Sequence, residues 1–480
     1  RLKVNWQLAD NTKIKFLISQ VDLNDPADIW TIDGSLNTLS DRPGMDSQKT
    51  NSYGMKVFHS FDGFELQSYT SSTDTNVIFS YDADWGNADS HFPYVYDYFS
   101  ETLRDRKSFN QEFRIVSDSA DFQENSFFEW VIGANYLELK ESNLKKDDGL
   151  YGDPSDPYGP YASASASSSK YKSSNFSVFG NLDYLLSASL KFSIGLRWED
   201  WEADYSDSLQ ESFNPTDKMS GGKISLIKNM TNDTNMYASL AKGYKQGGFN
   251  LGLGLDANAT NKNLAYDPEF LTNYELGINT KLLDSKITFN GVLFYSDRED
   301  QQVLISTQTD PSDPNTFSFL TQNAAEGVNH GLEINMDMDI NQSLSAFVNL
   351  GILKTEIKNW QSRQDLEGRA QAHAPERSYA LGLNWAPTSH TYLAIDFTGK
   401  SSFYYSDSHN NKSKSYVLTN LNLGYVKNNW NYELWARNIF DEYYSVRGFY
   451  FGNEAPNFID TLYERHGDPR HIGVSIRYDF

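Results

Sequence analysis

The last ten residues of the chain, 471–480, alternate between apolar and polar side chains without a break. Successive side chains of a β-strand point to opposite faces, so this segment predicts a strand with one wholly apolar face. A half-buried strand of a soluble sandwich would show the same alternation. An aromatic residue at the very end, Phe480, favours the closing strand of a membrane barrel, which lies between lipid and water.

The same two-residue period appears far from the C-terminus. In 332–340 every even position is apolar, and the odd positions include Glu333 and Asp337. Segment 430–437 alternates in the same way, with Glu433 and Arg437 on its polar side. A barrel with lipid outside and a polar lumen inside explains both rows.

Period-two alternation bounded by Gly, Asn, Asp and Pro predicts about nineteen strands. The predicted strands cover residues 2–8, 12–21, 51–58, 64–69, 108–117, 127–141, 175–186, 190–205, 218–228, 235–244, 273–283, 286–298, 329–340, 343–358, 378–385, 391–403, 416–426, 430–438 and 471–480. Their connections alternate between short turns, such as Asp62-Gly63, and long polar loops. The predicted long loops include 81–107, 142–173, 245–271 and 439–469.

Short turns on one rim and long loops on the other are the arrangement of outer-membrane barrels. The sequence therefore predicts an all-β fold, a transmembrane antiparallel up-and-down β-barrel, formed by residues 1–480 as one domain. Single-chain bacterial barrels normally have an even number of strands, so an odd count leads us to expect further strands before Arg1.

The composition fits a barrel better than a helical membrane protein. Hydrophobic residues make up 39% of the chain, and no apolar run approaches the roughly 20 residues that a spanning helix needs. Aromatic residues reach 15%, enough to form girdles at two membrane interfaces. The net charge of −23 disfavours nucleic acid as a partner, and the absence of cysteine excludes disulfides and thiolate metal sites.

Several short segments, in their order and spacing, resemble the barrel part of the TonB-dependent outer-membrane receptors of Gram-negative bacteria. They are 40–46 (SDRPGMD), 81–85 (YDADW), 111–117 (QEFRIVS), 195–199 (GLRWE), 242–250 (KGYKQGGFN), 273–277 (NYELG), 436–444 (ARNIFDEYY) and 467–470 (GDPR), with the terminal Phe480.

The resemblance implies a barrel of about 22 strands with a plugged lumen. About three strands, the plug and the short box that contacts the energy-coupling protein would then precede Arg1, because no segment of this chain matches them. The implied partners are outer-membrane lipid and lipopolysaccharide, a TonB-type coupling protein acting through the plug, and the barrel-assembly machinery acting on the strand that ends at Phe480. The implied ligand is a ferric siderophore or a similar nutrient.

Aromatic side chains in the predicted loops are the best candidates for ligand contact, since flat amphipathic rings stack on planar ligands and donate hydrogen bonds. Arginine and histidine beside them suit an anionic metal chelate. For each residue, an interface girdle, loop packing or a carboxylate neighbour is the competing explanation. The candidate ligand-binding residues are Tyr94, Tyr96, Tyr98, Phe99, Lys245, Phe249, Arg369, His373, Tyr404, Tyr405, Arg447 and Tyr450.

Catalysis and resident cofactors have no support in the sequence. The eight histidines show no HxxxH or HExxH spacing, and no serine lies in a GxSxG context. We therefore expect no enzyme, no cofactor and no metal site, and active uptake of a scarce nutrient, with a ferric siderophore as the leading ligand. The alternatives are a TonB-dependent receptor for oligosaccharides or another organic ligand, a passive porin and an outer-membrane hydrolase.

Overall fold

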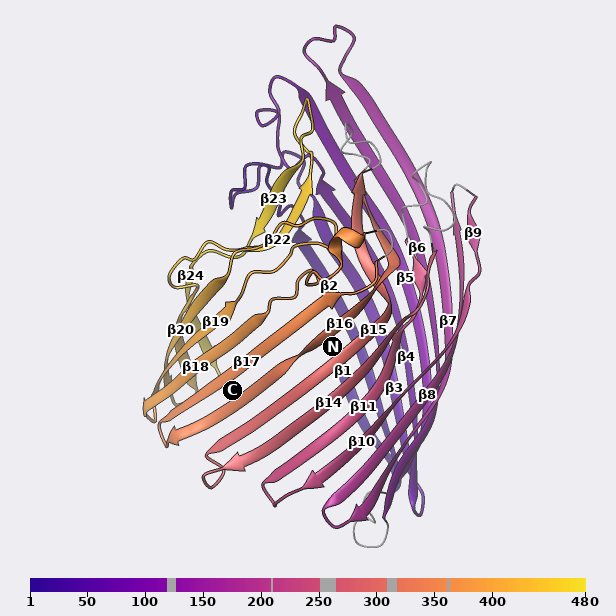
Figure 1. The fold of residues 1–480 in the computed structure, drawn as a ribbon, viewed down its shortest axis with the longest axis vertical. Helices are drawn as coiled ribbons and strands as arrows, with labels where there is room; N and C mark the ends of the chain where they lie inside the picture. Colours follow the sequence, from indigo (N-terminus) through magenta and orange to yellow (C-terminus); the bar gives the residue numbers. More distant parts are fainter. Residues whose placement is uncertain (119–126, 209, 251–264, 309–316, 361–362) are drawn as a thin grey trace.

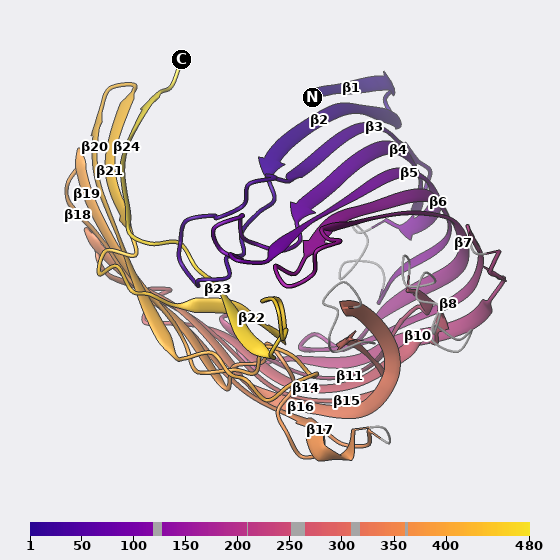
Figure 2. The same cartoon turned by 90° about the horizontal axis from the view of Figure 1, so that it is seen from above.

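The computed structural model describes residues 1–118, 127–208, 210–250, 265–308, 317–360 and 363–480. In this part of the chain one antiparallel sheet of 20 strands curves around a central space (Figures 1 and 2). One of the twenty, β9, has only 2 residues, and the other nineteen correspond to the predicted strands. The all-β, up-and-down fold expected from the sequence is confirmed.

Apart from the short β9, the strands of the large sheet pair in chain order. Those of the first half are β1 (Leu2–Ala9), β2 (Thr12–Pro26), β3 (Met45–Ser60), β4 (Phe64–Asp82), β5 (Val95–Ser117), β6 (Phe128–Gly152), β7 (Tyr161–Ser187), β8 (Leu190–Asp207), β9 (Ser212–Phe213) and β10 (Thr216–Asn229). Those of the second half are β11 (Thr234–Lys245), β14 (Glu269–Leu282), β15 (Ile287–Gln308), β16 (Phe317–Asn341), β17 (Leu344–Ile357), β18 (Arg377–Thr388), β19 (Thr391–Lys400), β20 (Tyr416–Lys427), β21 (Trp430–Arg437) and β24 (His471–Tyr478). Strand β10 pairs directly with β8, because the short β9 pairs only with β8.

Two small hairpins lie outside the large sheet. They are β12 (Gly248–Phe249) with β13 (Ala265–Tyr266), and β22 (Ser445–Phe451) with β23 (Thr461–His466). A single 3-10 turn, η3 (Gln364–Leu366), is the only helical element among the described residues. None of the described helical segments is long and apolar enough to cross a membrane.

The two rims differ as the sequence predicted. The amide of Asp479 donates to the carbonyl oxygen of Asn429 at 2.9 Å, which places the end of the chain beside the short β20–β21 turn. Longer connections, including the one that carries β22 and β23, lie at the opposite rim (Figure 1). We call these the short-turn rim and the long-loop rim.

The long-loop side contains more strand than the sequence predicted. Strand β5 begins at Val95 and β7 at Tyr161, so Tyr96, Tyr98 and Phe99 lie on a strand and not in a loop. The predicted loop 439–469 likewise contains β22 and β23. Beyond the bilayer both faces of a strand meet water, so the apolar period disappears while the backbone ladder continues.

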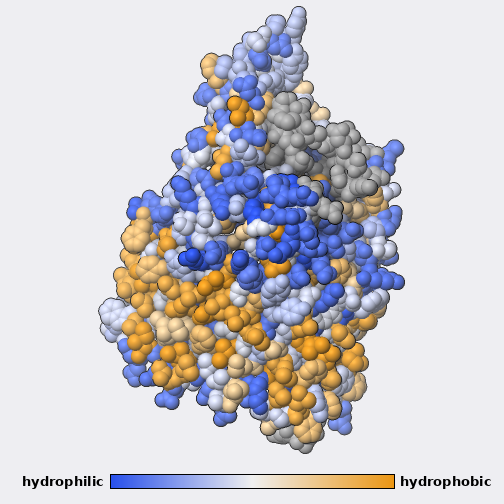
Figure 3. Space-filling model, viewed as in Figure 1, coloured by the Kyte–Doolittle hydropathy of each residue, from blue (hydrophilic) through white to orange (hydrophobic). Residues whose placement is uncertain are grey.

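An apolar belt covers the outer face near the short-turn rim. Leu276, Leu293 and Leu332 are in register on β14, β15 and β16, and the first two are 60% and 55% exposed. The alternate residues Glu333 and Asn335 face the lumen. Figure 3 shows apolar residues over the lower part of the visible face and hydrophilic residues above them. This is the surface that a strand-built membrane protein presents to lipid.

On the lumen side, aromatic rings lie over glycines of the adjacent strand. Phe347 on β17 is directly opposite Gly382 on β18, and a Cβ built on Gly382 would lie 2.1 Å from Phe347 Cε1. Tyr392 covers Gly424 in the same way on β19 and β20. Glycine leaves room for the ring to lie flat against the strand, which buries ring area that would otherwise face the lumen.

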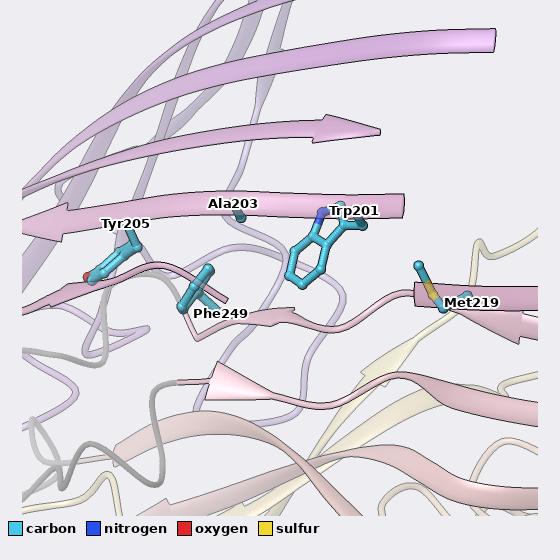
Figure 4. Packing of buried hydrophobic residues seen from close by; sticks show 5 residues of the cluster. All are labelled: Trp201, Ala203, Tyr205, Met219 and Phe249. Atoms are coloured by element: carbon cyan, nitrogen blue, oxygen red, sulfur yellow. The ribbon is translucent and has the colours of Figure 1, made fainter. Parts of the chain in front are cut away.

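A buried cluster inside the sheet fixes the path of β12. Trp201, Ala203 and Tyr205 on β8 pack with Met219 on β10 and Phe249 on β12 (Figure 4). Trp201 is 1% exposed, and its Nε1 donates to Ser173 Oγ at 3.0 Å. Phe249 therefore acts as a packing residue at this position.

Candidate ligand-binding site

Seen from above, the β22–β23 hairpin lies within the outline of the curved sheet (Figure 2), and in side view it stands at the long-loop rim (Figure 1). Arg447 and Phe449 of β22 lie directly opposite Arg465 and Tyr463 of β23. Opposed residues of an antiparallel pair share a face. One face of the hairpin is therefore both aromatic and cationic.

The aromatic side chains of this face pack against two tryptophans from other connections. Phe449 lies 4.5 Å from Trp30 and 6.0 Å from Trp85 between ring centroids, and the two indoles stack at 5.2 Å. Trp85 also meets Phe451 and Tyr463 edge-on. We call these five residues the aromatic platform.

Trp85 has a φ of 60°, a left-handed backbone conformation that is costly for a bulky residue. Hydrogen bonds on either side hold it there, because the carboxyl group of Asp84 accepts from Gly86 N at 3.0 Å and from Tyr98 N at 2.8 Å. This turn places the Trp85 indole against Phe449. The conformational strain at Trp85 is therefore the cost of positioning its ring.

The cationic end of the hairpin face consists of Arg447 and Arg465. The Arg447 guanidinium lies 5.0 Å from the Phe449 ring centroid. Partial burial and the neighbouring Arg465 lower the pKa of Arg447 from its usual value. Among the described residues neither arginine has a carboxylate partner within ion-pair distance. Like charges directly opposite each other on two strands are destabilising, so this pair favours an anion in its vicinity.

His373 lies beside this positive region as an uncharged group. Burial and the charge of Arg447 lower its pKa, with a smaller effect in the same direction from Lys400, while Asp407 opposes them. The imidazole is 5.6 Å from the Phe403 ring. His373 is thus predominantly neutral at neutral pH and accessible for hydrogen bonding.

The 401–415 connection is anchored beside the hairpin by Arg369. The guanidinium pairs with Asp407 at 2.8 Å, donates to the carbonyl oxygens of Ser406 and His409, and lies 4.3 Å from the Tyr404 ring. These contacts satisfy the charge of Arg369 within the protein. Arg369 therefore acts as a structural anchor in this arrangement.

Tyr405 and Tyr450 lie on the other side of the hairpin. The Tyr405 hydroxyl donates to Glu464 of β23, and burial with this carboxylate raises the tyrosine pKa. Tyr450, which is 41% exposed, lies 5.7 Å from the His409 ring. Both residues fasten the hairpin to the 401–415 connection.

The first group of predicted aromatics lies on the opposite side of the hairpin. Tyr96 is buried, contacts the rings of Tyr98 and Phe458, and donates to Asn453 Oδ1 at 3.2 Å. Tyr94 precedes it, with its amide bonded to the His91 carbonyl. Through Asn453 and Phe458, Tyr96 contacts the loop that joins β22 to β23.

Two more of the predicted residues lie apart from the hairpin face. The Arg42 guanidinium lies over the Phe99 ring, 4.7 Å from its centroid. Lys245, at the end of β11, is exposed near the cluster that contains Phe249.

The structure therefore brings together most of the predicted residues around one hairpin, with Lys245 and Phe249 in a separate group. Sequence reasoning missed Trp30, Trp85 and Arg465. Trp85 lies in one of the segments that carried the family resemblance, which was a usable signal, whereas nothing in the sequence around Trp30 or Arg465 marked them. Among the described residues, no group of three or more His, Asp or Glu side chains is arranged to hold a metal ion.

The fold defines a class of protein: a β-barrel of the outer-membrane type, with a hairpin at its long-loop rim that has a cationic and aromatic face. A family model described as TonB dependent receptor-like, beta-barrel matches residues 5–439, and the chain belongs to this family. It is accordingly an outer-membrane protein.

Sequence relatives within the family include pesticin receptors. That of Yersinia pestis is 23% identical over 267 residues, which covers 54% of this chain and 36% of the receptor. The pesticin receptor of Yersinia enterocolitica gives the same values. The aligned region thus spans little more than a third of these curated relatives.

Solved structures match over nearly the whole chain. The ferric yersiniabactin uptake receptor FyuA of Yersinia pestis superposes with a TM-score of 0.75 at 16% identity, covering 98% of this chain and 68% of that one. The siderophore receptor PiuA of Acinetobacter baumannii gives 0.74 at 15% identity, with coverages of 99% and 73%. The copper transporter OprC gives 0.70 at 13% identity, with coverages of 100% and 71%. The TM-scores show that these proteins share the fold of this chain, and at identities this low the comparison shows the fold alone.

Proposed function

We propose that this protein is the barrel of a receptor for active uptake of an anionic, ring-bearing metal chelate, with a ferric siderophore as the leading ligand. The proposal rests mainly on the opposed pair Arg447 and Arg465 beside the aromatic platform. Two guanidinium groups provide charge-assisted donors for carboxylate, catecholate or similar oxygens. Phe449 and Trp30 provide faces against which a planar ligand stacks.

The overall charge of the protein strengthens this reasoning. At −23, the chain repels anions at long range unless local cations reverse the field. Arg447, Arg465 and Lys400 form such a local region, with the neutral imidazole of His373 beside it and Asp407 as a nearby acid that is itself engaged by Arg369. The names of the relatives agree with this proposal, since several are receptors for ferric chelates.

Uptake also requires a closed, plugged barrel. In the described residues β1 pairs only with β2, and β24 only with β21, and Figure 2 shows the two edges apart. Unpaired backbone groups in lipid are costly. We propose that further strands close this gap, that a plug fills the lumen, and that a TonB-type protein moves the plug. Outer-membrane lipid, lipopolysaccharide and the barrel-assembly machinery are the other proposed partners.

A receptor for oligosaccharides is the second candidate, because exposed aromatic faces bind sugars as well as chelates. The aromatic platform supports both ligands, whereas the arginine pair favours an anionic one. No covalent chemistry is part of either proposal.

Binding measurements on the full-length receptor test the choice. We would compare ferric citrate, a ferric catecholate and a neutral oligosaccharide, using calorimetry to measure the affinity of each. Arg447→Gln and Arg465→Gln should each weaken binding of the anionic chelate about 10-fold or more, as expected for loss of one charged hydrogen bond.

Arg477→Gln serves as the matched control, because Arg477 is an exposed arginine paired with Asp479 at the short-turn rim. It should leave affinity unchanged. Tight binding of the oligosaccharide, unaffected by either hairpin variant, would overturn the chelate proposal in favour of the second candidate.

A further inference from the structure

Two carboxyl groups are buried where β4 ends. Asp82 and Asp84 are each 1% exposed. Oδ2 of Asp82 accepts a hydrogen bond from Ser40 Oγ at 2.8 Å and a long one from Arg42 N at 3.5 Å. Its Oδ1 is buried and has no hydrogen-bond partner among the described residues. A buried carboxylate with an unsatisfied oxygen is costly, whereas a neutral carboxylic acid is much less so.

Asp84, by contrast, is fully engaged as an anion. Its oxygens accept from Gly86 N and Tyr98 N, and His91 Nε2 lies 3.3 Å from Oδ1. Burial opposes ionisation, but hydrogen bonds from His91 and from the Tyr98 amide outweigh it and hold the pKa of Asp84 below its usual value. The two neighbouring acids are thus held in different protonation states.

The other charged groups around the pair do not neutralise Asp82. The Arg42 guanidinium is directed to Asp97 at 3.1 Å and Asp148 at 2.7 Å. Asp28, from the β2–β3 connection, accepts hydrogen bonds from the amides of Asp82 and Gly44. His91 Nε2 faces Asp84 Oδ1 at 3.3 Å. Burial and the charge of Asp84 therefore raise the pKa of Asp82 to about 7.

These contacts join three connections of the long-loop rim. Ser40, Arg42 and Asp28 belong to the 27–44 connection, which also carries Trp30. Asp84 belongs to the 83–94 connection, which carries Trp85. The third is the loop that joins β22 to β23, because Asn453 Nδ2 donates to the Asp84 carbonyl at 3.1 Å. The aromatic platform is assembled from the first two connections and from the β22–β23 hairpin that this loop closes.

We propose that the Asp82 side chain is a proton-operated latch: with its proton bound it holds the 27–44 and 83–94 connections against the β22–β23 hairpin, and on losing the proton it loosens them. The physical cause is the buried oxygen without a partner next to a second, anionic carboxylate. Release of the latch separates Trp30 and Trp85 from Phe449 and opens the platform. This inference concerns regulation of the rim and stands independently of which ligand the platform binds.

The direction of the pH effect follows from linkage. A carboxyl group whose pKa is raised in the closed form favours that form at low pH. This advantage is lost as the pH rises from about 4, the ordinary pKa of an aspartate, to about 7, the pKa of Asp82 in the closed form. Within that window the equilibrium constant for opening rises by up to about tenfold per pH unit, and it is level above pH 7. Asp84, with its lowered pKa, affects opening only in more acidic solution.

Hydrogen exchange of the full-length receptor in detergent micelles tests the latch. Protection factors, which remove the intrinsic pH dependence of exchange, would be measured between pH 5 and 8.5 for peptides covering 27–44 and 83–94. In the wild type, protection should fall by 10-fold or more between pH 5 and 7 and level off above it. In Asp82→Asn, a neutral isostere, protection should be independent of pH.

Two further variants keep the test decisive. Asp41→Asn, an exposed aspartate in the same 27–44 connection, should retain the wild-type pH profile. Ser40→Ala removes the hydroxyl that stabilises ionised Asp82, so it should move the midpoint to higher pH even if Asp82→Asn fails to fold. A wild-type profile without pH dependence, or an unshifted midpoint in Ser40→Ala, would overturn the latch.

Discussion

Asn453 Nδ2 donates a hydrogen bond of 3.1 Å to the main-chain oxygen of Asp84, across 369 residues of sequence. The same amide group accepts from the Tyr96 hydroxyl, and Asn453 is 1% exposed. One buried side chain therefore connects the loop of the β22–β23 hairpin with β5 and with the connection that follows β4. The position of the aromatic platform depends on this link.

Asn453→Ala should release the hairpin from β5 and from the connection that follows β4. It removes the side-chain donor to the Asp84 carbonyl in a buried site, at a cost of about 1–3 kcal/mol, and it also removes the amide oxygen that accepts from the Tyr96 hydroxyl. Hydrogen exchange in β22 and β23 should accelerate, while β14–β17 remain unchanged. Tyr96→Phe removes only the hydroxyl, so its effect should be smaller. Equal exchange in both variants would contradict this role of Asn453.

Gly382→Ala tests the packing of aromatic rings over glycines. The new methyl group would lie within 2.1 Å of Phe347 Cε1, so the ring must leave its place on the neighbouring strand. We expect a loss of about 1–3 kcal/mol in the free energy of unfolding, measured by urea titration in vesicles. In the control Gly243→Ala, nothing lies within 4 Å of the added Cβ, so stability should be nearly unchanged.

Leu276→Arg tests the lipid-facing belt. Leu276 is 60% exposed at the centre of the apolar row, and a charge there would face hydrocarbon. We expect a loss of about 2–4 kcal/mol and poor insertion into lipid vesicles. Asn335→Arg, on the lumen face of β16, should insert normally. Normal insertion of Leu276→Arg would mean that this row does not contact lipid.

Arg369→Met tests the anchor of the 401–415 connection. The substitution leaves Asp407 buried without its cation, and loss of one partner of a buried pair costs about 3–5 kcal/mol. The expected outcome is rapid proteolytic cleavage within 401–415, detected by mass spectrometry. The matched change at an exposed pair outside this connection, Arg477→Met, should leave the cleavage rate as it is in the wild type. Equal cleavage in both variants would show that Arg369 is dispensable.

Much of the candidate site could be predicted by residue type but not by role. Tyr405, Arg447 and Tyr450 were predicted as loop residues, and they do lie on or against one hairpin. Arg369 was expected at a ligand, yet its own loop satisfies its charge. Which cation is left without a carboxylate depends on contacts between segments far apart in sequence, and no local pattern records these.

The sequence by itself determined the number of long strands, their two faces, and the sorting of short and long connections between the rims. These are local properties, because a period of two is imposed within each strand and a turn needs only a few residues. The tertiary structure alone decided how far the strands extend into water, and that Trp30, Trp85, Arg447 and Arg465 converge. Curvature of the sheet and the position of the β22–β23 hairpin bring these residues together, and both arise from packing between distant segments.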